Sequence, residues 1–319
     1  MLTKAAKQGH AGAQISLGHC FLHGRGVIQD NTQAAEWYTE AAEQGLAEAQ
    51  HHIGLMYVNG LGVSQSISEA IEWFEKAAEQ GVMDSQYMVA QCYLSGYVSQ
   101  TSVKANSWLE KVVEKIGSNN KYVIGNCDKA IQWLEKAAEK GHMKSLLSLA
   151  DCYEQGRGVP LDFVKATYWY RMAASLGDTN AQCSLAEYCE KGQGLPRDYS
   201  QAAEWYKKAA DKGHPWAQKS YRLACYNQGL LFKKGEGVLQ DYTMAAEWLK
   251  KAADHGQVDA HYELGVCYEK GHGVSQDYFI AVKYYTYAAE QGNANAQHDL
   301  GLCYKNGYGV AKDHTEATK

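Results

Sequence analysis

The chain has 319 residues, of which 45% are hydrophobic, and this length exceeds what one compact core usually holds. Lys and Arg total 31 and Asp and Glu total 36, which gives a formal net charge of −5 without any run of like charges. This mild acidity argues against a nucleic-acid-binding protein, which should carry a basic face, and no apolar run is long enough to insert into a membrane.

The chain begins with residues 1–9, which resemble the end of a helix whose first half is missing. This segment lacks the apolar core of a signal peptide, and we therefore expect a soluble protein. The nine cysteines favour a reducing compartment such as the cytoplasm, because an odd number spread along the chain does not fit a ladder of disulfides. A periplasmic or secretory origin stays open if the chain is a fragment of a longer protein.

Residues 10–45 predict a helical hairpin. Gly24 and Gly26 interrupt the chain between two helices, Asp30 can cap the second helix, and Gly45 can end it in a left-handed conformation. Each helix has apolar residues at helical spacing, which predicts one buried face per helix. These residues are Ala13, Leu17 and Phe21 in the first helix, and Ala34, Trp37 and Ala41 in the second.

Almost all the rest of the chain repeats this hairpin, so we treat residues 1–319 as a single array of repeats. In unit 118–141 a second helix is present but there is no room for a complete first helix. In unit 214–256, extra residues near 218–223 predict a lengthened first helix. After the partial unit 1–9, the units are 10–45, 46–81, 82–117, 118–141 (truncated), 142–177, 178–213, 214–256 (enlarged), 257–292 and 293–319 (partial).

Five cysteines occupy one recurring place, directly before the aromatic residue of a first helix. A small apolar side chain at this place suits the seam between two helices, so we interpret these cysteines as packing residues. They are Cys20, Cys92, Cys152, Cys267 and Cys303.

The recurring patterns Ala-x-x-x-Leu-Gly-x-x-Tyr, Gly-x-Gly-Val, Asp-x-x-x-Ala-x-x-Trp-Tyr and Lys-Ala-Ala-Glu-x-Gly resemble the Sel-one-like repeat (SLR) family. These are relatives of tetratricopeptide repeats, whose period is about 34 residues. The resemblance implies an all-α fold, a right-handed α/α superhelical solenoid of helical hairpins, and a role as a scaffold for protein complexes. The chain departs from the family's cysteine-rich bacterial branch, in which each hairpin carries a disulfide, and from the regular repeat at 118–141.

No catalytic, cofactor or metal site is expected. The paired loop glycines recur in most units and follow no strand, so they predict turns and not a dinucleotide fingerprint. His19 and His23 share a helical face, and His51 and His52 lie in the next first helix. They lack a recognised metal-binding motif such as HExxH or a paired Cys-x-x-Cys, so no metal site is predicted from them.

We expect a protein or peptide partner to bind the concave face of the superhelix, which first-helix positions outside the core should line. Acidic residues in 142–213 suggest a partner with a basic segment, although a merely solvated acidic surface explains them equally well. Charge reversal at Asp151, Glu154 and Glu187 is expected to weaken binding without lowering thermal stability. The candidate residues are His19, Leu22, His51, Leu55, Tyr87, Gln91, Asp151, Glu154, Glu187, Glu190, Tyr262, Glu269, His298 and Lys305.

A non-catalytic scaffold or adaptor is the function that the sequence favours. One alternative is an SLR-type enzyme or ligand-binding protein acting on cell-wall material, for which a compact pocket with perturbed titratable groups would be expected. The other is a piece of a larger chain or complex that works only within it, because both ends of the sequence fall inside a hairpin.

Overall fold

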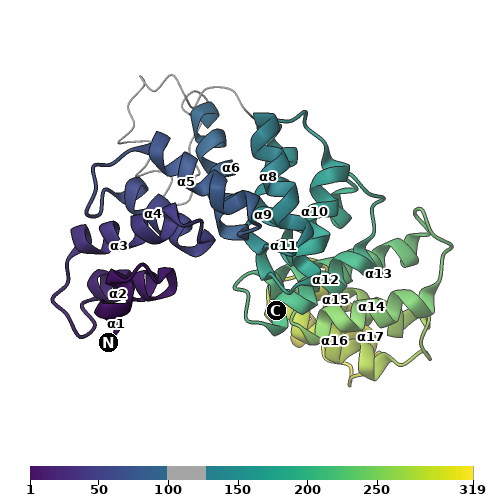
Figure 1. The fold of residues 1–319 in the computed structure, drawn as a ribbon. Coiled ribbons are helices and arrows are strands. Elements are labelled where there is room, and N and C mark those ends of the chain that lie inside the picture. Colours follow the sequence, from purple (N-terminus) through teal and green to yellow (C-terminus); the bar gives the residue numbers. More distant parts are fainter. Residues whose placement is uncertain (99–126, 319) are drawn as a thin grey trace. The chain divides into compact units, whose positions relative to one another are not determined.

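A computed structural model describes residues 1–98 and 127–318 of the chain, and within these residues helices follow one another without any strand (Figure 1). The chain forms two compact units, an N-terminal unit of residues 1–176 and a C-terminal unit of residues 177–319. The helices of the N-terminal unit are α1 (Leu2–Lys7), α2 (Ala11–His23), α3 (Asn31–Glu43), α4 (Ala47–Asn59), α5 (Ile67–Glu79), α6 (Met83–Val98), α8 (Cys127–Glu139), α9 (Met143–Gln155) and α10 (Phe163–Ser175).

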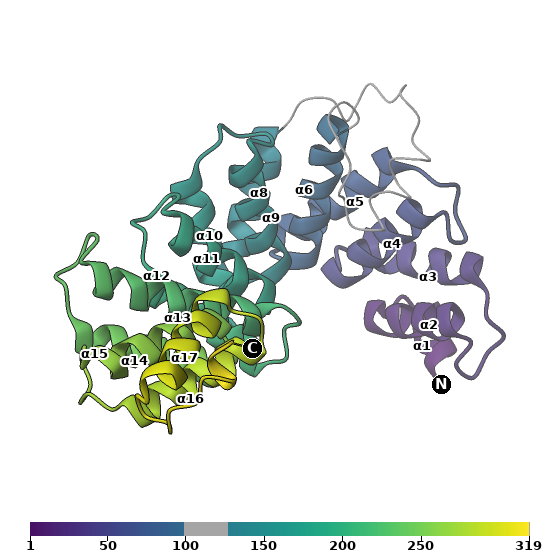
Figure 2. The ribbon, with the colours of Figure 1, turned by 180° about the vertical axis from the view of Figure 1, so that it is seen from behind.

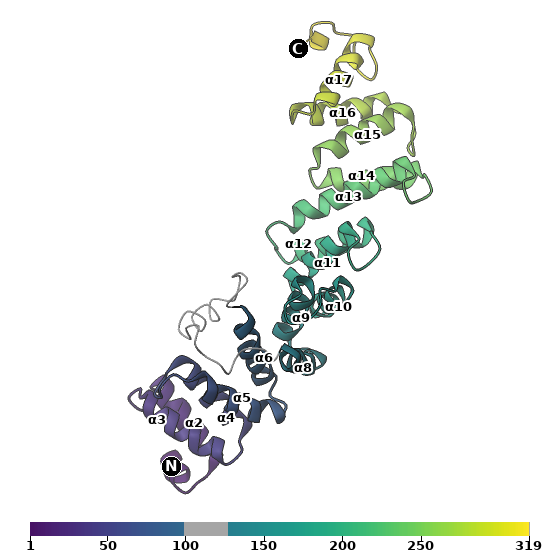
Figure 3. The same ribbon diagram turned by 90° about the horizontal axis from the view of Figure 1, so that it is seen from above.

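The C-terminal unit continues the same alternation of first and second helices (Figure 2). Most helices of both units have 13 residues, whereas α13 has 18, as the extra residues of its repeat predict (Figure 3). The helices are α11 (Thr179–Lys191), α12 (Tyr199–Asp211), α13 (Ala217–Lys234), α14 (Tyr242–Asp254), α15 (Val258–Lys270), α16 (Tyr278–Glu290), α17 (Ala294–Asn306) and a short 3₁₀ helix, η1 (Glu316–Thr318).

Side-chain caps and glycines set the limits of these helices. The carboxylate of Asp30 accepts hydrogen bonds from the backbone N–H groups of Thr32 and Gln33, and so starts α3 as predicted. At the other end of the loop, Gly24 follows α2 in the left-handed conformation with φ of 66°, which L-residues with a Cβ rarely adopt. The same loop chemistry recurs along the chain and produces the regular hairpins.

The buried aromatic residue of the second helix is not the predicted tryptophan. Ala34 and Ala41 are buried, but Trp37 is only half-buried, and its neighbour Tyr38 is completely buried. Trp37 packs toward the preceding α1–α2 layer, whereas Tyr38 packs against α4 of the next repeat, so the second helix contacts both neighbours. The corresponding residues of other repeats are also buried, namely Phe74, Leu134, Tyr170, Tyr206, Leu249 and Tyr285.

The close approach of these aromatic rings explains the glycine that follows leucine or isoleucine in several first helices. A Cβ built on Gly54 would lie 2.6 Å from Cε1 of Phe74, which is closer than such atoms can pack. Glycine at this position therefore lets α4 and α5 pack in close contact.

The irregular part of the array lies around α8. The second helix expected in 82–117 falls outside the described residues, as does the N-terminal part of the truncated unit 118–141. A helix is present at Cys127–Glu139, and this α8 packs along α6 in the way that α3 packs along α2. The hairpin of the third repeat is thus formed by α6 and α8, which are not consecutive along the chain because α6 ends at Val98 and α8 begins at Cys127.

The cysteines are packing residues, as their positions predict. Seven of the nine, including Cys92 and Cys152, are buried among helices. Burial raises the pKa of the Cys92 thiol to about 12, which keeps it protonated and unreactive at neutral pH.

Candidate functional site

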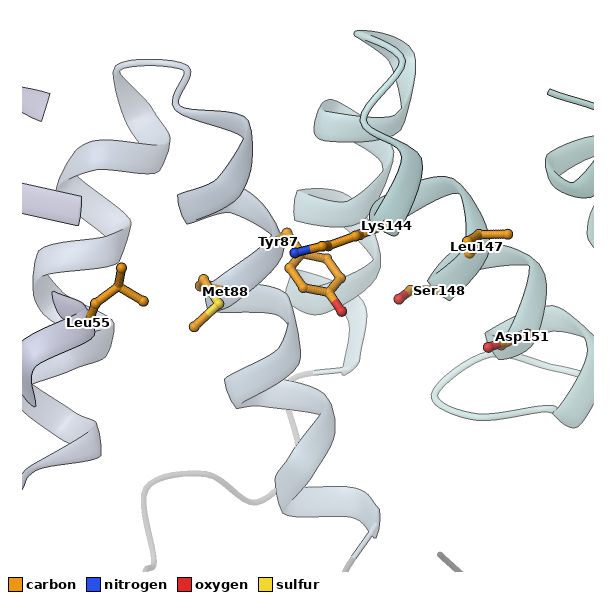
Figure 4. Close-up of a pocket in the computed structure, with 7 residues that line it drawn as sticks. All are labelled: Leu55, Tyr87, Met88, Lys144, Leu147, Ser148 and Asp151. Atoms are coloured by element: carbon orange, nitrogen blue, oxygen red, sulfur yellow. The ribbon is translucent and has the colours of Figure 1, made fainter. Parts of the chain in front are cut away.

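A cavity of about 610 Å³ opens on the first-helix face of the N-terminal unit (Figure 4). Three candidate residues from the sequence, Leu55, Tyr87 and Asp151, lie on its wall, although they belong to three different repeats. They come together because α4, α6 and α9 are consecutive first helices that turn the same side to the cavity (Figure 4). Leu55 and Asp151 occupy equivalent positions of their repeats, and Tyr87 lies one helical turn before the equivalent position of α6. The remaining lining residues are Met88, Lys144, Leu147 and Ser148.

Contacts between α6 and α9 hold the centre of this cavity in place. Tyr87 is 7% exposed, and its ring lies 5.6 Å from that of His142 and 5.9 Å from the ammonium of Lys144. The side-chain amide of Gln91, another candidate, donates to Oγ of Ser148 at 3.2 Å. Gln91 therefore joins two first helices and is buried, instead of facing a groove.

Asp151 is the anionic residue of the cavity. Its Oδ1 lies 2.8 Å from the hydroxyl of Tyr170, and its Oδ2 lies 3.9 Å from the guanidinium of Arg157. Burial is the main cause that raises the pKa of Asp151, and the charge of Glu154 adds to the effect. The same hydroxyl lies 2.8 Å from Oε2 of Glu154, so the single phenol hydrogen is shared between two carboxylates.

Three candidate glutamates have a structural role that the sequence analysis missed. Each accepts a hydrogen bond from the buried tyrosine of its own second helix, so each lies at the seam of a hairpin. Asp151 and Glu154 both lie 2.8 Å from the Tyr170 hydroxyl, so we expect charge reversal at both residues together to remove its acceptors and to lower stability as well as binding. The pairs are Tyr170 with Glu154 (2.8 Å), Tyr206 with Glu190 (3.1 Å) and Tyr285 with Glu269 (2.6 Å).

The other candidates of the C-terminal unit make local contacts. Glu187 pairs with Lys191 one turn later at 3.0 Å. The hydroxyl of Tyr262 donates to Oδ2 of Asp299 at 3.2 Å, and Nδ1 of His298 lies 2.9 Å from the other oxygen of that carboxylate. Lys305 is exposed, and in the first repeat of the N-terminal unit Leu22 is half-buried.

Histidines cluster on the first-helix face of the first two repeats. Nδ1 of His19 lies 2.9 Å from the hydroxyl of Tyr38, and the ring of His52 stacks on that tyrosine at 5.0 Å. His51 turns the other way, with Nδ1 2.8 Å from Oγ of Ser85. Burial lowers the pKa of His51, and burial together with the neighbouring His19 lowers that of His52 to about 4.

Sequence reasoning missed several residues of these two places. His52 was named in the sequence only beside His51, without a predicted role, and Lys144 and Leu147 were not considered. The repeat predicts that each of these residues lies on a first helix. Which residues of other repeats they contact depends on how one first helix is stacked on the next. One signal was available, since each occupies a first-helix position that is not part of the Leu-Gly core.

Hairpins joined by two-glycine loops, with each first helix stacked beside the next, define an α-helical repeat solenoid of the tetratricopeptide kind. The chain belongs to the Sel1 repeat family. The family matches it nine times, over residues 11–46, 47–82, 84–114, 118–142, 144–178, 179–214, 221–257, 258–293 and 294–319. Sel1 repeat proteins are in general non-catalytic scaffolds that mediate protein interactions.

Two solved structures are similar over 99% of this chain. One is c5321, described as a protective antigen of uropathogenic Escherichia coli with an SLR fold, at 31% identity and a TM-score of 0.55. The other is a Sel1 repeat protein from Oxalobacter formigenes, at 29% identity and a TM-score of 0.53, of which 83% is covered. The chain spans 61% of the length of the E. coli protein.

A search of curated proteins gave no match. Among the described residues, every helix is too short or too polar to cross a lipid bilayer.

Proposed function

We propose that this Sel1 repeat chain is a non-catalytic scaffold that binds a peptide or protein partner on its first-helix face. The cavity between α4, α6 and α9 is the observation that carries the proposal. Side chains from three successive repeats line it, so a partner bound there would contact all three. In the C-terminal unit, Glu187, Glu190, Tyr262, Glu269 and His298 are proposed to contribute to partner binding.

The lining of the cavity indicates the chemistry of the partner. Leu55, Met88 and Leu147 are apolar, and Tyr87 adds an aromatic surface, which suits an apolar anchor side chain. Asp151 on the same wall would attract a basic residue next to that anchor. The proposed partner is therefore a segment with an apolar residue close to a lysine or arginine.

The proposal is tested by filling the cavity. Leu147 is half-buried on the cavity wall, and Leu147→Arg should fill part of the cavity with a long cation. Val164 on α10 is 63% exposed and lies outside the cavity, so Val164→Arg adds the same charge without that effect. Each variant and the unaltered chain are used as bait in a lysate of the source organism, after circular dichroism has shown equal melting temperatures.

Partners that depend on the cavity should be recovered with the Val164→Arg variant and lost with Leu147→Arg. In the otherwise unaltered chain, Asp151→Asn should also weaken their recovery when the partner segment is basic. This change removes the negative charge and keeps an acceptor for the Tyr170 hydroxyl. Recovery of the same proteins in the same amounts with both arginine variants would contradict binding at this cavity.

A further inference from the structure

Three possible metal ligands meet between the first two repeats. His19 comes from α2, and Glu48 and His52 come from α4. One ligand atom of each residue, a ring nitrogen or a carboxylate oxygen, lies within 4.8 Å of the other two. The sequence analysis expected no metal here, because the two helices carry no recognised binding motif. The structure shows instead that the repeat stacking brings them together.

The spacing of the atoms fits a shared ion better than a hydrogen bond. Nε2 of His19 lies 3.8 Å from Oε1 of Glu48, which is too long for a hydrogen bond. Two ligands bound at about 2.1 Å to a tetrahedral ion stand about 3.4 Å apart, so a small movement of the exposed glutamate would bring this pair of atoms to that separation.

Neighbouring groups already orient the two imidazoles. The hydroxyl of Tyr38 lies 2.9 Å from Nδ1 of His19, and the other ring nitrogen of His19, Nε2, faces Glu48. A hydrogen bond of this kind on the second ring nitrogen is typical of metal-bound histidines. The completely buried ring of Tyr38 also stacks on His52, whose ring meets that of His19 edge-on at 4.7 Å.

We propose that His19, Glu48 and His52 bind one divalent transition-metal ion of the Zn²⁺ class and thereby link the first two repeats. Two imidazoles and a carboxylate favour such ions over Mg²⁺ or Ca²⁺, which prefer oxygen ligands. Three protein ligands leave a fourth position for water or for a side chain of another molecule. The side chains of His19 and Glu48 are 33% and 66% exposed, so an ion from solution can reach them.

The site is tested with the full, tag-free chain after treatment with a chelator. Titration calorimetry with Zn²⁺ should show one ion bound per chain. Glu48→Gln should weaken this binding about tenfold or more, because an amide is a poor zinc ligand. Since Glu48 is largely exposed, this variant should fold normally. His52→Ala should give the same loss, with its folding checked by circular dichroism.

His298→Ala is the matched control. His298 on α17 lies 2.9 Å from the carboxylate of Asp299 and does not belong to the group of His19, Glu48 and His52. Its replacement should leave Zn²⁺ affinity unchanged. Bound Co²⁺ should give visible bands of a nitrogen–oxygen site without thiolate charge transfer, because no cysteine is among the proposed ligands.

Three results would overturn the proposal. They are the absence of stoichiometric Zn²⁺ binding, equal binding by the unaltered chain and Glu48→Gln, and a thiolate spectrum with Co²⁺. The site does not depend on the proposed partner cavity, so its failure would leave the scaffold function unaffected.

Discussion

In several repeats a buried tyrosine of the second helix needs a hydrogen-bond acceptor, and a residue near the end of the first helix supplies it. A completely or nearly buried phenol needs an acceptor, and the acceptor lies 16 residues earlier in three repeats. Where the second helix has Phe74, the corresponding residue is the buried Val58, which needs no partner. Part of the acidic character of the first-helix face thus follows from the core and not from a partner. The tyrosine–glutamate pairs are Tyr170–Glu154, Tyr206–Glu190 and Tyr285–Glu269.

The raised pKa of Asp151 predicts a pH-dependent contribution to stability. Its folded-state pKa exceeds the ordinary value of 3.8, so the folded chain binds the proton more tightly than the unfolded chain. The resulting stabilisation is complete below the unfolded pKa and is lost as the pH rises through the folded pKa. The Asp151→Asn side chain is neutral at every pH. The free energy of unfolding of this variant should therefore rise relative to that of the unaltered chain between about pH 4 and pH 7.

Urea unfolding at these two pH values, followed by circular dichroism, measures the difference. The Asp151 side chain is 45% exposed, so the change should be less than about 1 kcal/mol. A difference between variant and unaltered chain that is the same at both pH values would contradict a raised pKa at this residue.

The candidate site could be predicted only in part at this scale. The positions of Leu55, Tyr87 and Asp151 follow from the period of the repeat, and the structure places them on one cavity. The burial of Gln91 and the metal-like grouping of His19 with His52 could not be predicted. They depend on the stacking of successive hairpins, which one repeat considered alone does not contain.

At the scale of the single element, aspartate caps set where the second helices begin. Asp241 accepts hydrogen bonds from the backbone N–H groups of Thr243 and Met244 at 2.9 and 3.0 Å. The same arrangement recurs at Asp30, Asp162, Asp198 and Asp277. A single aspartate therefore satisfies two of the otherwise unpaired N–H groups at the start of each helix.

Asp241→Ala should lower the free energy of unfolding by about 1 kcal/mol, because both N–H groups of α14 lose their acceptor. Asp241→Asn keeps a side-chain oxygen at the cap and should retain most of the stability, which makes it the matched control. Thermal melts of the three proteins at neutral pH compare them. Equal losses in both variants would show that charge, and not capping, is what matters at Asp241.

The elements themselves were largely predictable from the sequence. Capping residues, loop glycines and the 3.6-residue period gave the regular helices, and the extra residues of 214–256 predicted the longer α13. The partnership of α6 with α8 could not be derived in this way. Local patterns predict where a helix forms, but which helix packs beside it is decided by tertiary contacts.

At the scale of the whole molecule, a repeat array distributes its stability among neighbours. Each hairpin packs mainly on the hairpins before and after it, so a cavity in one repeat should weaken nearby repeats most. Leu249 on α14 is completely buried among residues of α13, α14 and α15. Leu249→Ala should cost about 2–5 kcal/mol locally, because it leaves a void in that core.

Hydrogen–deuterium exchange on the intact chain can locate this loss. Leu249→Ala should speed amide exchange in α13, α14 and α15 and leave α2 to α5 unchanged. Ile53→Ala on α4, which removes an equally buried side chain of the N-terminal unit, is the reciprocal control and should give the opposite distribution. An equal rise in exchange through both units for either variant would contradict neighbour-limited stability, because it would mean that all the repeats unfold together.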